Sequence, residues 1–333
     1  MNQNSGYGKA LLSAIASQIP AFGNILVVMN SSDSDEKNYQ QMQDVFPVDD
    51  SGNVRFFTTV AAAYAAAESN NNDVICIDAN SAHSNAMITV AKNRVHFMGF
   101  DGGGRLNSQG AKLIVPATDV AASIAVIYNT GTRNTYRNLK IYQQGTNAAQ
   151  INGMIDIGEG TYVENCNIDC YSNLTTASHC ALKFAGDTCH YKDCQIGGST
   201  VLHDEANQAP LYIHTHGGAT ARYSYFENCE IIQYSTATTA SCIDVDEAAG
   251  VIGWIKFKNC QLTSASKGNG ATAAGAMAEA VTSVLTAGYL YFDGRCESYN
   301  AALFSEADAS ILAASQAAAG NSASLGGKAI AAA

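Results

Sequence analysis

The sequence predicts an all-β fold, a right-handed parallel β-helix in which the short strands of successive coils stack into sheets. Two observations support this prediction. A six-residue motif occurs six times between Tyr136 and Tyr299, and apolar and polar residues alternate inside each copy. The length of 333 residues does not require a division into two domains, because every repeat of a solenoid adds its own slice of core.

The motif consists of an apolar residue, a charged or polar residue, Asn or Asp, Cys or Leu, a polar residue and an aliphatic residue. Its copies begin at Tyr136, Val163, Tyr191, Phe226, Phe257 and Phe292, and the last copy carries an extra residue, Arg295. The fourth position recurs at intervals of 27, 28, 35, 31 and 36 residues. Periods of roughly 20 to 50 residues are typical of solenoids, and unequal intervals predict loops of different length on one side.

The alternation inside the motif predicts strands. Cys166 and Ile168 are two residues apart with a polar residue between them, which is the strand period. The Asn or Asp at the third position predicts a bend, because these residues tolerate a left-handed backbone. Coils that stack at about 4.8 Å place the fourth positions in one inward structural ladder, whose cysteines are expected to be buried free thiols. This ladder contains Leu139, Cys166, Cys194, Cys229, Cys260 and Cys296.

Further elements are expected upstream of the motif. The segments 73–78 and 94–100 are predicted to be the strands of a first coil, followed by a glycine turn at 102–104 and a strand at 112–115. The Ala-rich segment 59–67 predicts a helix that Thr58 or Thr59 caps and that closes one end of the solenoid.

Three parts of the chain are therefore expected. Residues 1–73 form an N-terminal arm and capping segment, residues 74–300 form the β-helix, and residues 301–333 form an Ala-rich C-terminal tail. The tail has few aromatic residues, so we expect either a short helix with a flexible end or an arm that a partner orders.

Composition argues against two classes of partner. The net charge is -11 and no run of Lys and Arg stands out, so we expect no binding to nucleic acid. No apolar segment approaches the roughly 18 residues of a membrane-spanning helix, so we expect no membrane contact. The apolar stretch 10–19 follows one charge and lacks a cleavage site, so we interpret it as mature protein. The ten cysteines are expected to be reduced.

Carboxylates are the first candidates for catalysis, because glycosidic cleavage needs an acid and a base or nucleophile about one bond. Asp244 and Asp246 are two residues apart on an expected strand, with Glu247 beside them, and Asp204 and Glu205 could approach from a neighbouring coil. We favour a solvated acidic loop, since the fold alone does not imply activity. We therefore expect no catalytic residues and no enzymatic activity.

Histidines are the candidates for a metal site. His214 and His216 would point the same way from a strand and could bind a metal together with His203, Asp204 or His190. Cys180, Cys189 and His190 raise the same question, but their spacing matches no zinc pattern. We favour exposed or interface histidines and expect no metal and no cofactor.

Three N-terminal segments carry a resemblance to a known family: 25–28, 38–47 and 50–63. With the Asp-Val-Ile strand that follows and the loop around His83, they resemble tailed-bacteriophage virion proteins with a pectate-lyase-like β-helix. The likeness covers residues 23–100, and Asp78–Ala82 replaces the Pro-Gly turn expected before the histidine. The resemblance implies a capsid decoration or cement protein of the virion surface, assembled in the host cytoplasm. It also implies a homotrimer that binds the major capsid protein.

Three functions remain open at this stage. We favour a structural virion protein that binds and stabilises the capsid shell. A tail fibre or tailspike-like β-helix would instead bind or cleave host surface polysaccharide. Such a site should show exposed aromatic rings beside carboxylates, and Trp254 is the only tryptophan. A secreted carbohydrate-active enzyme is disfavoured by the missing signal peptide.

Overall fold

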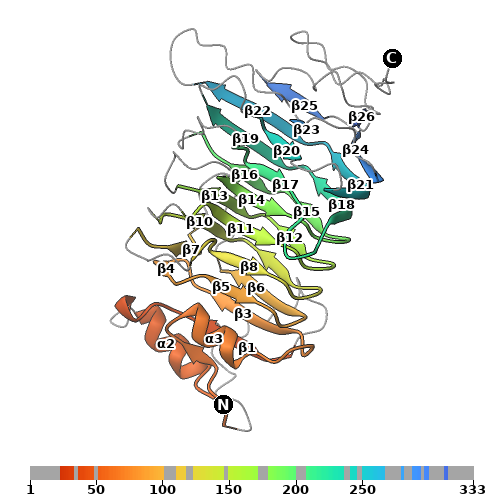
Figure 1. The fold of residues 1–333 in the computed structure, drawn as a ribbon. Coiled ribbons are helices and arrows are strands. Elements are labelled where there is room, and N and C mark those ends of the chain that lie inside the picture. The colour runs from red at the N-terminus through yellow and green to blue at the C-terminus, as the bar shows by residue number, and fades with distance from the viewer. Residues whose placement is uncertain are drawn as a thin grey trace, which may run out of the picture.

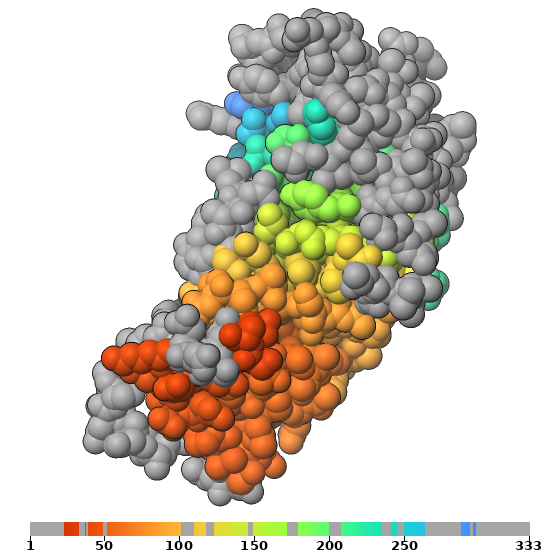
Figure 2. All heavy atoms as spheres, turned by 90° about the vertical axis from the view of Figure 1, so that its left-hand side faces the viewer, coloured from red at the N-terminus to blue at the C-terminus, as the bar shows by residue number. Residues whose placement is uncertain are grey.

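The computed structural model confirms the right-handed parallel β-helix (Figure 1). It describes residues 23–33, 37–48, 52–100, 110–117, 123–145, 149–171, 179–199, 208–235, 241–245, 250–266, 279–280, 287–293, 296–299 and 311–313. The coils form an elongated body, and Figure 2 shows that residue numbers rise along its length. Three parallel sheets of 11, 8 and 7 strands run along it, which we name sheets I, II and III.

Sheet I contains, in spatial order, β2 (Phe56–Phe57), β1 (Ile25–Val28), β3 (Asp73–Ile77), β6 (Val95–Gly99), β9 (Thr135–Arg137), β12 (Tyr162–Glu164), β15 (His190–Lys192), β18 (Ala221–Glu227), β21 (Val251–Lys258), β24 (Ala287–Asp293) and β26 (Ile311–Ala313). Sheet II contains β4 (Ala82–Ser84), β7 (Lys112–Val115), β10 (Lys140–Gln143), β13 (Asn167–Cys170), β16 (Gln195–Gly197), β19 (Glu230–Ser235), β22 (Gln261–Ser266) and β25 (Glu297–Tyr299). Sheet III contains β5 (Ile88–Val90), β8 (Ile127–Asn129), β11 (Asn152–Asp156), β14 (Cys180–Phe184), β17 (Leu211–Ile213), β20 (Ile243–Val245) and β23 (Glu279–Ala280).

The first coils are arranged differently from the sequence prediction. The segments 73–78 and 94–100 were expected in one coil, but β3 and β6 pair with each other in sheet I, so they occupy the same place in consecutive coils. The short strands β4 and β5 complete the coil between them. Their three residues each give too short an alternation to stand out in the sequence.

The interior is a set of columns, in which each residue touches the same motif position of the coils above and below. The ladder residues Leu139, Cys166, Cys194, Cys229, Cys260 and Cys296 are 0 to 4% exposed and belong to one apolar cluster. The first motif position builds an aromatic column beside them. The Phe226 ring is stacked 4.9 Å from Tyr191 and 5.1 Å from Phe257, and Phe257 is 4.8 Å from Phe292.

The bend between sheets I and II is a ladder of left-handed residues, as the sequence predicted. Backbone φ is between 52° and 55° at Asn138, Asn165, Asp193, Asn228 and Asn259. Side chains join the turns of successive coils: the Asn165 amide donates to Asn138 at 2.8 Å and the Asn228 amide donates to Asp193 at 3.1 Å. The bend is therefore stabilised by hydrogen bonds along the helix axis as well as by a residue type that accepts positive φ.

Two α-helices, α2 (Lys37–Val45) and α3 (Val60–Ala66), and the short 3-10 helix η1 (Ser31–Asp33) lie at the N-terminal end (Figure 1). Thr59 caps α3, since its hydroxyl accepts a hydrogen bond from the Ala62 amide at 3.2 Å. Tyr39 and Met42 of α2 pack in a second apolar cluster with residues of β1, β3 and β6. In the part of the chain that the structure describes, no helix is long and apolar enough to cross a membrane.

Burial of the thiols generates a first prediction. All ten cysteines are buried and free, so their sulfurs are shielded from a reagent in solution, and burial raises the pKa of Cys242 to about 12. We expect an aromatic disulfide reagent to modify fewer than one thiol per native chain within minutes and ten after denaturation. Rapid reaction of the native protein would show that the column is open to solvent.

A second prediction concerns the ladder itself. Replacing Cys229, which is 1% exposed, by Asp should cost several kcal/mol of unfolding free energy, because a charge would lie unpaired in an apolar column. Cys229→Ala is the matched control and should cost only about 1 kcal/mol, since it removes one small apolar group. Urea unfolding monitored by circular dichroism measures both. Equal costs for the two variants would contradict burial of this position.

Candidate functional site

Charged residues form a straight row on the outer face of sheet I, at the second motif position. The paired strands bring Arg137, Glu164, Lys192, Glu227, Lys258 and Asp293 into register, so that cations and anions alternate. Glu164 lies 3.1 Å from Arg137 and 3.2 Å from Lys192, and Glu227 lies 2.9 Å from Lys258. The sequence analysis recorded this position only as charged or polar and missed the alternation, which was visible in the aligned copies.

The outer face of sheet I changes character at β21. From β9 to β18, two residues lie between the left-handed residue at the entry of the strand and the buried aromatic or aliphatic residue. In β21 three residues do so, because Gly253 and Trp254 together stand opposite Tyr223 of β18. The extra residue persists in β24, where Tyr289 pairs with Trp254. Such bulges re-aim side chains, and here the inserted residue is aromatic in both strands.

The bulge fixes the position of Tyr223. The entry turn has φ between 47° and 73° at Arg133, Gly160, Thr188, Tyr223 and Gly253. For a bulky residue such as Tyr223 this backbone is rare. A Cβ on Gly253 would lie 2.3 Å from Cε1 of Tyr223, so only glycine leaves room for the ring to lie there.

These features open an aromatic patch, which we define as Tyr223, Tyr225, Trp254, Tyr289 and Tyr291 on β18, β21 and β24. Tyr223 is 45% exposed and Tyr225 is 36% exposed. The Trp254 ring lies 5.9 Å from Tyr223 and 4.9 Å from Tyr225.

Other rings extend the aromatic patch towards the N-terminal coils. The His190 ring lies 5.9 Å from Tyr225, and the Tyr162 ring lies 5.4 Å from His190. A continuous path of aromatic surface therefore follows the helix axis over four strands.

Paired charges surround the aromatic patch. The amino group of Lys256 lies 5.8 Å from the Tyr225 ring and 5.1 Å from the Tyr291 ring, and it pairs with Asp293 at 2.7 Å. Glu227 also lies 3.3 Å from Nε2 of His190. The hydrogen bond from Lys258 lowers the pKa of Glu227. Burial raises this pKa and His190 lowers it, and the net effect is a lowered pKa. The patch is therefore apolar at its centre and rimmed by carboxylates and cations whose hydrogen-bonding atoms face water.

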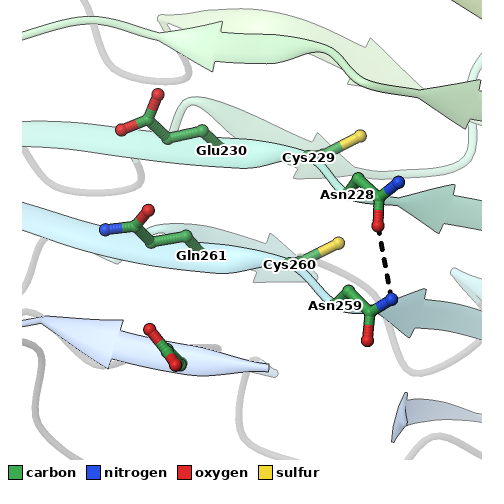
Figure 3. Close-up of a pocket in the computed structure, with 7 residues that line it drawn as sticks. Asn228, Cys229, Glu230, Asn259, Cys260 and Gln261 are labelled. Carbon is green, nitrogen blue, oxygen red and sulfur yellow. Dashed lines mark hydrogen bonds between the residues drawn. The ribbon is translucent and has the colours of Figure 1, made fainter. Parts of the chain in front are cut away.

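A polar hollow of about 480 Å³ lies across the bend between sheets I and II (Figure 3). Glu230, Gln261 and Glu297 stand in register on β19, β22 and β25, and the Asn259 amide donates to Asn228 at 3.3 Å. Figure 3 shows the sulfurs of Cys229 and Cys260 pointing away from Glu230 and Gln261. This arrangement presents hydrogen-bonding groups without an aromatic platform.

The carboxylates singled out in the sequence are not brought together in the described part of the chain. Asp244 is 3% exposed on β20, beside Tyr212 of β17. Asp204, Glu205, Asp246 and Glu247 lie outside the described residues. The structure thus defines no carboxylate pair at this place.

The histidines are divided between two sheets. The His214 ring lies 5.3 Å from Tyr212 and the His216 ring 5.6 Å from Tyr128 beside sheet III, whereas His190 is on sheet I. Burial, Lys183 and His214 lower the pKa of His216. His203 lies outside the described residues, and among those that are described no three His, Cys, Asp or Glu side chains gather as metal ligands.

The remaining candidates are buried. Cys180 donates to Asn152 at 3.0 Å, and Cys189 is 1% exposed. His83 is 3% exposed, with Nε2 at 2.7 Å from the Asp78 carboxylate. The loop without the Pro-Gly turn therefore joins this histidine to Asp78 inside the coil.

Comparison with known proteins finds distant similarity to solved structures. No protein-family model and no curated protein matches the chain. The solved pectin methylesterase of Erwinia chrysanthemi is 14% identical and covers 79% of this chain and 91% of that chain, with a TM-score of 0.42. That of Aspergillus niger in deglycosylated form is 11% identical over 85% of this chain and 86% of that chain, with a TM-score of 0.41. A pectin methylesterase in complex with a hexasaccharide is 14% identical and covers 79% of this chain and 91% of that chain, with a TM-score of 0.42.

These neighbours correct one prediction and leave others in place. All of them are enzymes, which contradicts the prediction that this chain is not an enzyme, and we withdraw it. The parallel β-helix fold that the resemblance implied is confirmed. The virion, the capsid surface and the trimer stay predictions from the N-terminal segments.

The charge row generates a third prediction. The pKa of Glu227 is lowered from its ordinary value of 4.5. The ionised carboxylate therefore stabilises the fold fully above pH 4.5, and this stabilisation is lost as the pH falls through the lowered pKa. Glu227→Gln should therefore lower the free energy of unfolding by about 0.5 to 1 kcal/mol at neutral pH and leave it unchanged in strong acid. Urea unfolding at several pH values measures the difference. A cost that does not change with pH would mean that the carboxylate charge plays no part.

Proposed function

We propose that this chain binds an extended polysaccharide along the outer face of sheet I, with the aromatic patch as its binding site. The observation that carries the proposal is the row of aromatic rings on β18, β21 and β24 beside Glu227 and Asp293, in which the two tyrosines of β18 are exposed and the rings of β21 and β24 are half-buried. This is the combination of exposed rings and carboxylates that the sequence analysis required of a polysaccharide site.

The chemistry of sugars fits this surface. A pyranose ring has C–H groups on its flat faces, which pack on aromatic rings, and hydroxyls on its rim, which hydrogen-bond to carboxylates and amino groups. Neighbouring strands are about 4.8 Å apart, close to the length of one sugar in a chain. Successive strands can therefore present one contact to each successive sugar, and a polymer parallel to the axis would be gripped at several points.

The proposal corresponds to the tailspike-like alternative of the sequence analysis. Its first choice, a capsid decoration protein that binds the major capsid protein as a homotrimer, rests on the N-terminal resemblance alone. We retain the role of a capsid decoration protein as a separate proposal. Cryo-electron microscopy of native particles tests it, because density for the β-helix on the capsid surface is expected and its absence there would refute it.

The polysaccharide site can be tested with an internal reporter. Trp254 is the only tryptophan and lies in the aromatic patch, so its fluorescence should change on titration with a recognised polysaccharide. We would screen purified bacterial surface polysaccharides, with pectin included, by affinity electrophoresis and record any release of sugar products. Trp254→Ala should weaken binding at least tenfold, which corresponds to about 1.4 kcal/mol.

Tyr142→Ala is the matched control, because Tyr142 is a partly buried aromatic residue on sheet II, away from the aromatic patch. It should bind as the unchanged protein does. Equal losses in both variants, or a polysaccharide that binds without any change in Trp254 fluorescence, would overturn the proposed site.

A further inference from the structure

Buried polar side chains with some atoms that lack a hydrogen-bond partner lie on the outer face of sheet II. Side chains alternate along a strand, and Ile168 of β13 belongs to the interior cluster, so Asn167 and Asp169 point outward. Both are 0% exposed. Gln195 of β16 pairs in register with Asn167 and is 3% exposed.

Three oxygens of this group lack a hydrogen-bond partner, namely Oδ1 of Asn167, Oδ2 of Asp169 and Oε1 of Gln195, and so does the amide nitrogen Nδ2 of Asn167. The other groups are only partly engaged. Oδ1 of Asp169 accepts from the Cys170 amide at 2.8 Å, and Nε2 of Gln195 donates to the Gly197 carbonyl at 3.4 Å. A buried acceptor without a partner costs about 1 to 3 kcal/mol, so three together call for an occupant.

A second buried carboxylate shows how the chain satisfies such a group for structural purposes. Asp156 is 0% exposed. Its two oxygens accept from Asn129 at 2.7 Å and Tyr191 at 2.7 Å, with further bonds from Gly158 and Thr161. Asp169 has no comparable shell around Oδ2, which separates it from a structural carboxylate.

We propose that Asn167, Asp169 and Gln195 bind a hard divalent cation, calcium, between β13 and β16. Calcium takes carboxylate and amide oxygens as ligands, and it accepts several such oxygens at once. A water molecule has two hydrogens and would leave one acceptor unsatisfied. Gly198 lies against the carboxylate, since a Cβ there would lie 2.6 Å from Oδ2 of Asp169, so only glycine allows this close approach of the backbone.

Charge at the site is consistent with this occupant. The polar and charged groups that act on Asp169 are the Cys170 amide, the Lys140 amino group and the Tyr171 hydroxyl, and a bound cation would favour the ionised carboxylate. The amino group of Lys140 lies 5.0 Å from the Tyr142 ring and 6.0 Å from the Tyr171 ring. Lys140 is the natural competitor for the carboxylate, so the experiment must distinguish calcium from lysine.

The test uses the full chain, first stripped with EDTA and then titrated with calcium chloride. Isothermal titration calorimetry should show one calcium per chain, and the unfolding temperature should rise by several degrees because only the folded state holds the site. Asp169→Asn should lose at least tenfold in calcium affinity. In EDTA the same variant should be as stable as the unchanged protein or more stable, since it removes a buried charge.

Two further variants keep the test decisive. Asp193→Asn removes the same charge at a turn position that Asn occupies in other coils, so it should bind calcium normally. Gln195→Leu should weaken binding even if Asp169→Asn fails to fold. Terbium luminescence excited through tyrosine should appear in the unchanged protein and disappear in Gln195→Leu.

If calcium does not change the unfolding temperature of the unchanged protein, the Asp169 carboxylate is paired with Lys140 instead, and the proposal is overturned. Retention of binding in both site variants would place the ion elsewhere on the chain and overturn it as well.

Discussion

In-register stacking of the coils is the constraint on which the rest of this structure depends. Each coil places the same motif position directly above its counterpart, about one strand spacing away. A residue is therefore acceptable only if it packs well against a similar residue. This accounts for the thiol ladder, the aromatic column, the left-handed asparagine bend and, on the outside, the alternation of charge. Like charges in such a row would repel at every step, whereas alternating charges pair in both directions.

The same constraint explains how far the sequence could predict the fold. A repeat that must stack is visible as a repeat, so the motif strands, their inward face and the bend at Asn228 and Asn259 followed from spacing and alternation. The three-residue strands β4 and β5 have no such signal, and the strands on either side of them, β3 and β6, were consequently assigned to one coil. The helix α2 was also missed, because its polar residues give little apolar periodicity.

The candidate site could be predicted only in part. The aromatic residues Tyr225, Trp254 and Tyr291 precede the motif in plain view, but their exposure depends on a bulge that begins at Gly253 and becomes visible only when β18 and β21 are paired. The carboxylates that the sequence singled out, such as Asp244, do not lie at the aromatic patch. The carboxylates that do, such as Glu227, occur within the motif itself. Open oxygens at Asn167 and Gln195 leave no trace in sequence, because they depend on burial and on missing partners.

The central claim is that the outer face of sheet I recognises polysaccharide through the aromatic patch. A crystal structure of the chain with a bound oligosaccharide tests it most directly. The account predicts sugar rings packed on Trp254 and Tyr225, with the polymer parallel to the axis and its hydroxyls bonded to Glu227 or Asp293. Sugar bound in the polar hollow beside Glu230 or over sheet III, with the aromatic patch unoccupied, would contradict it.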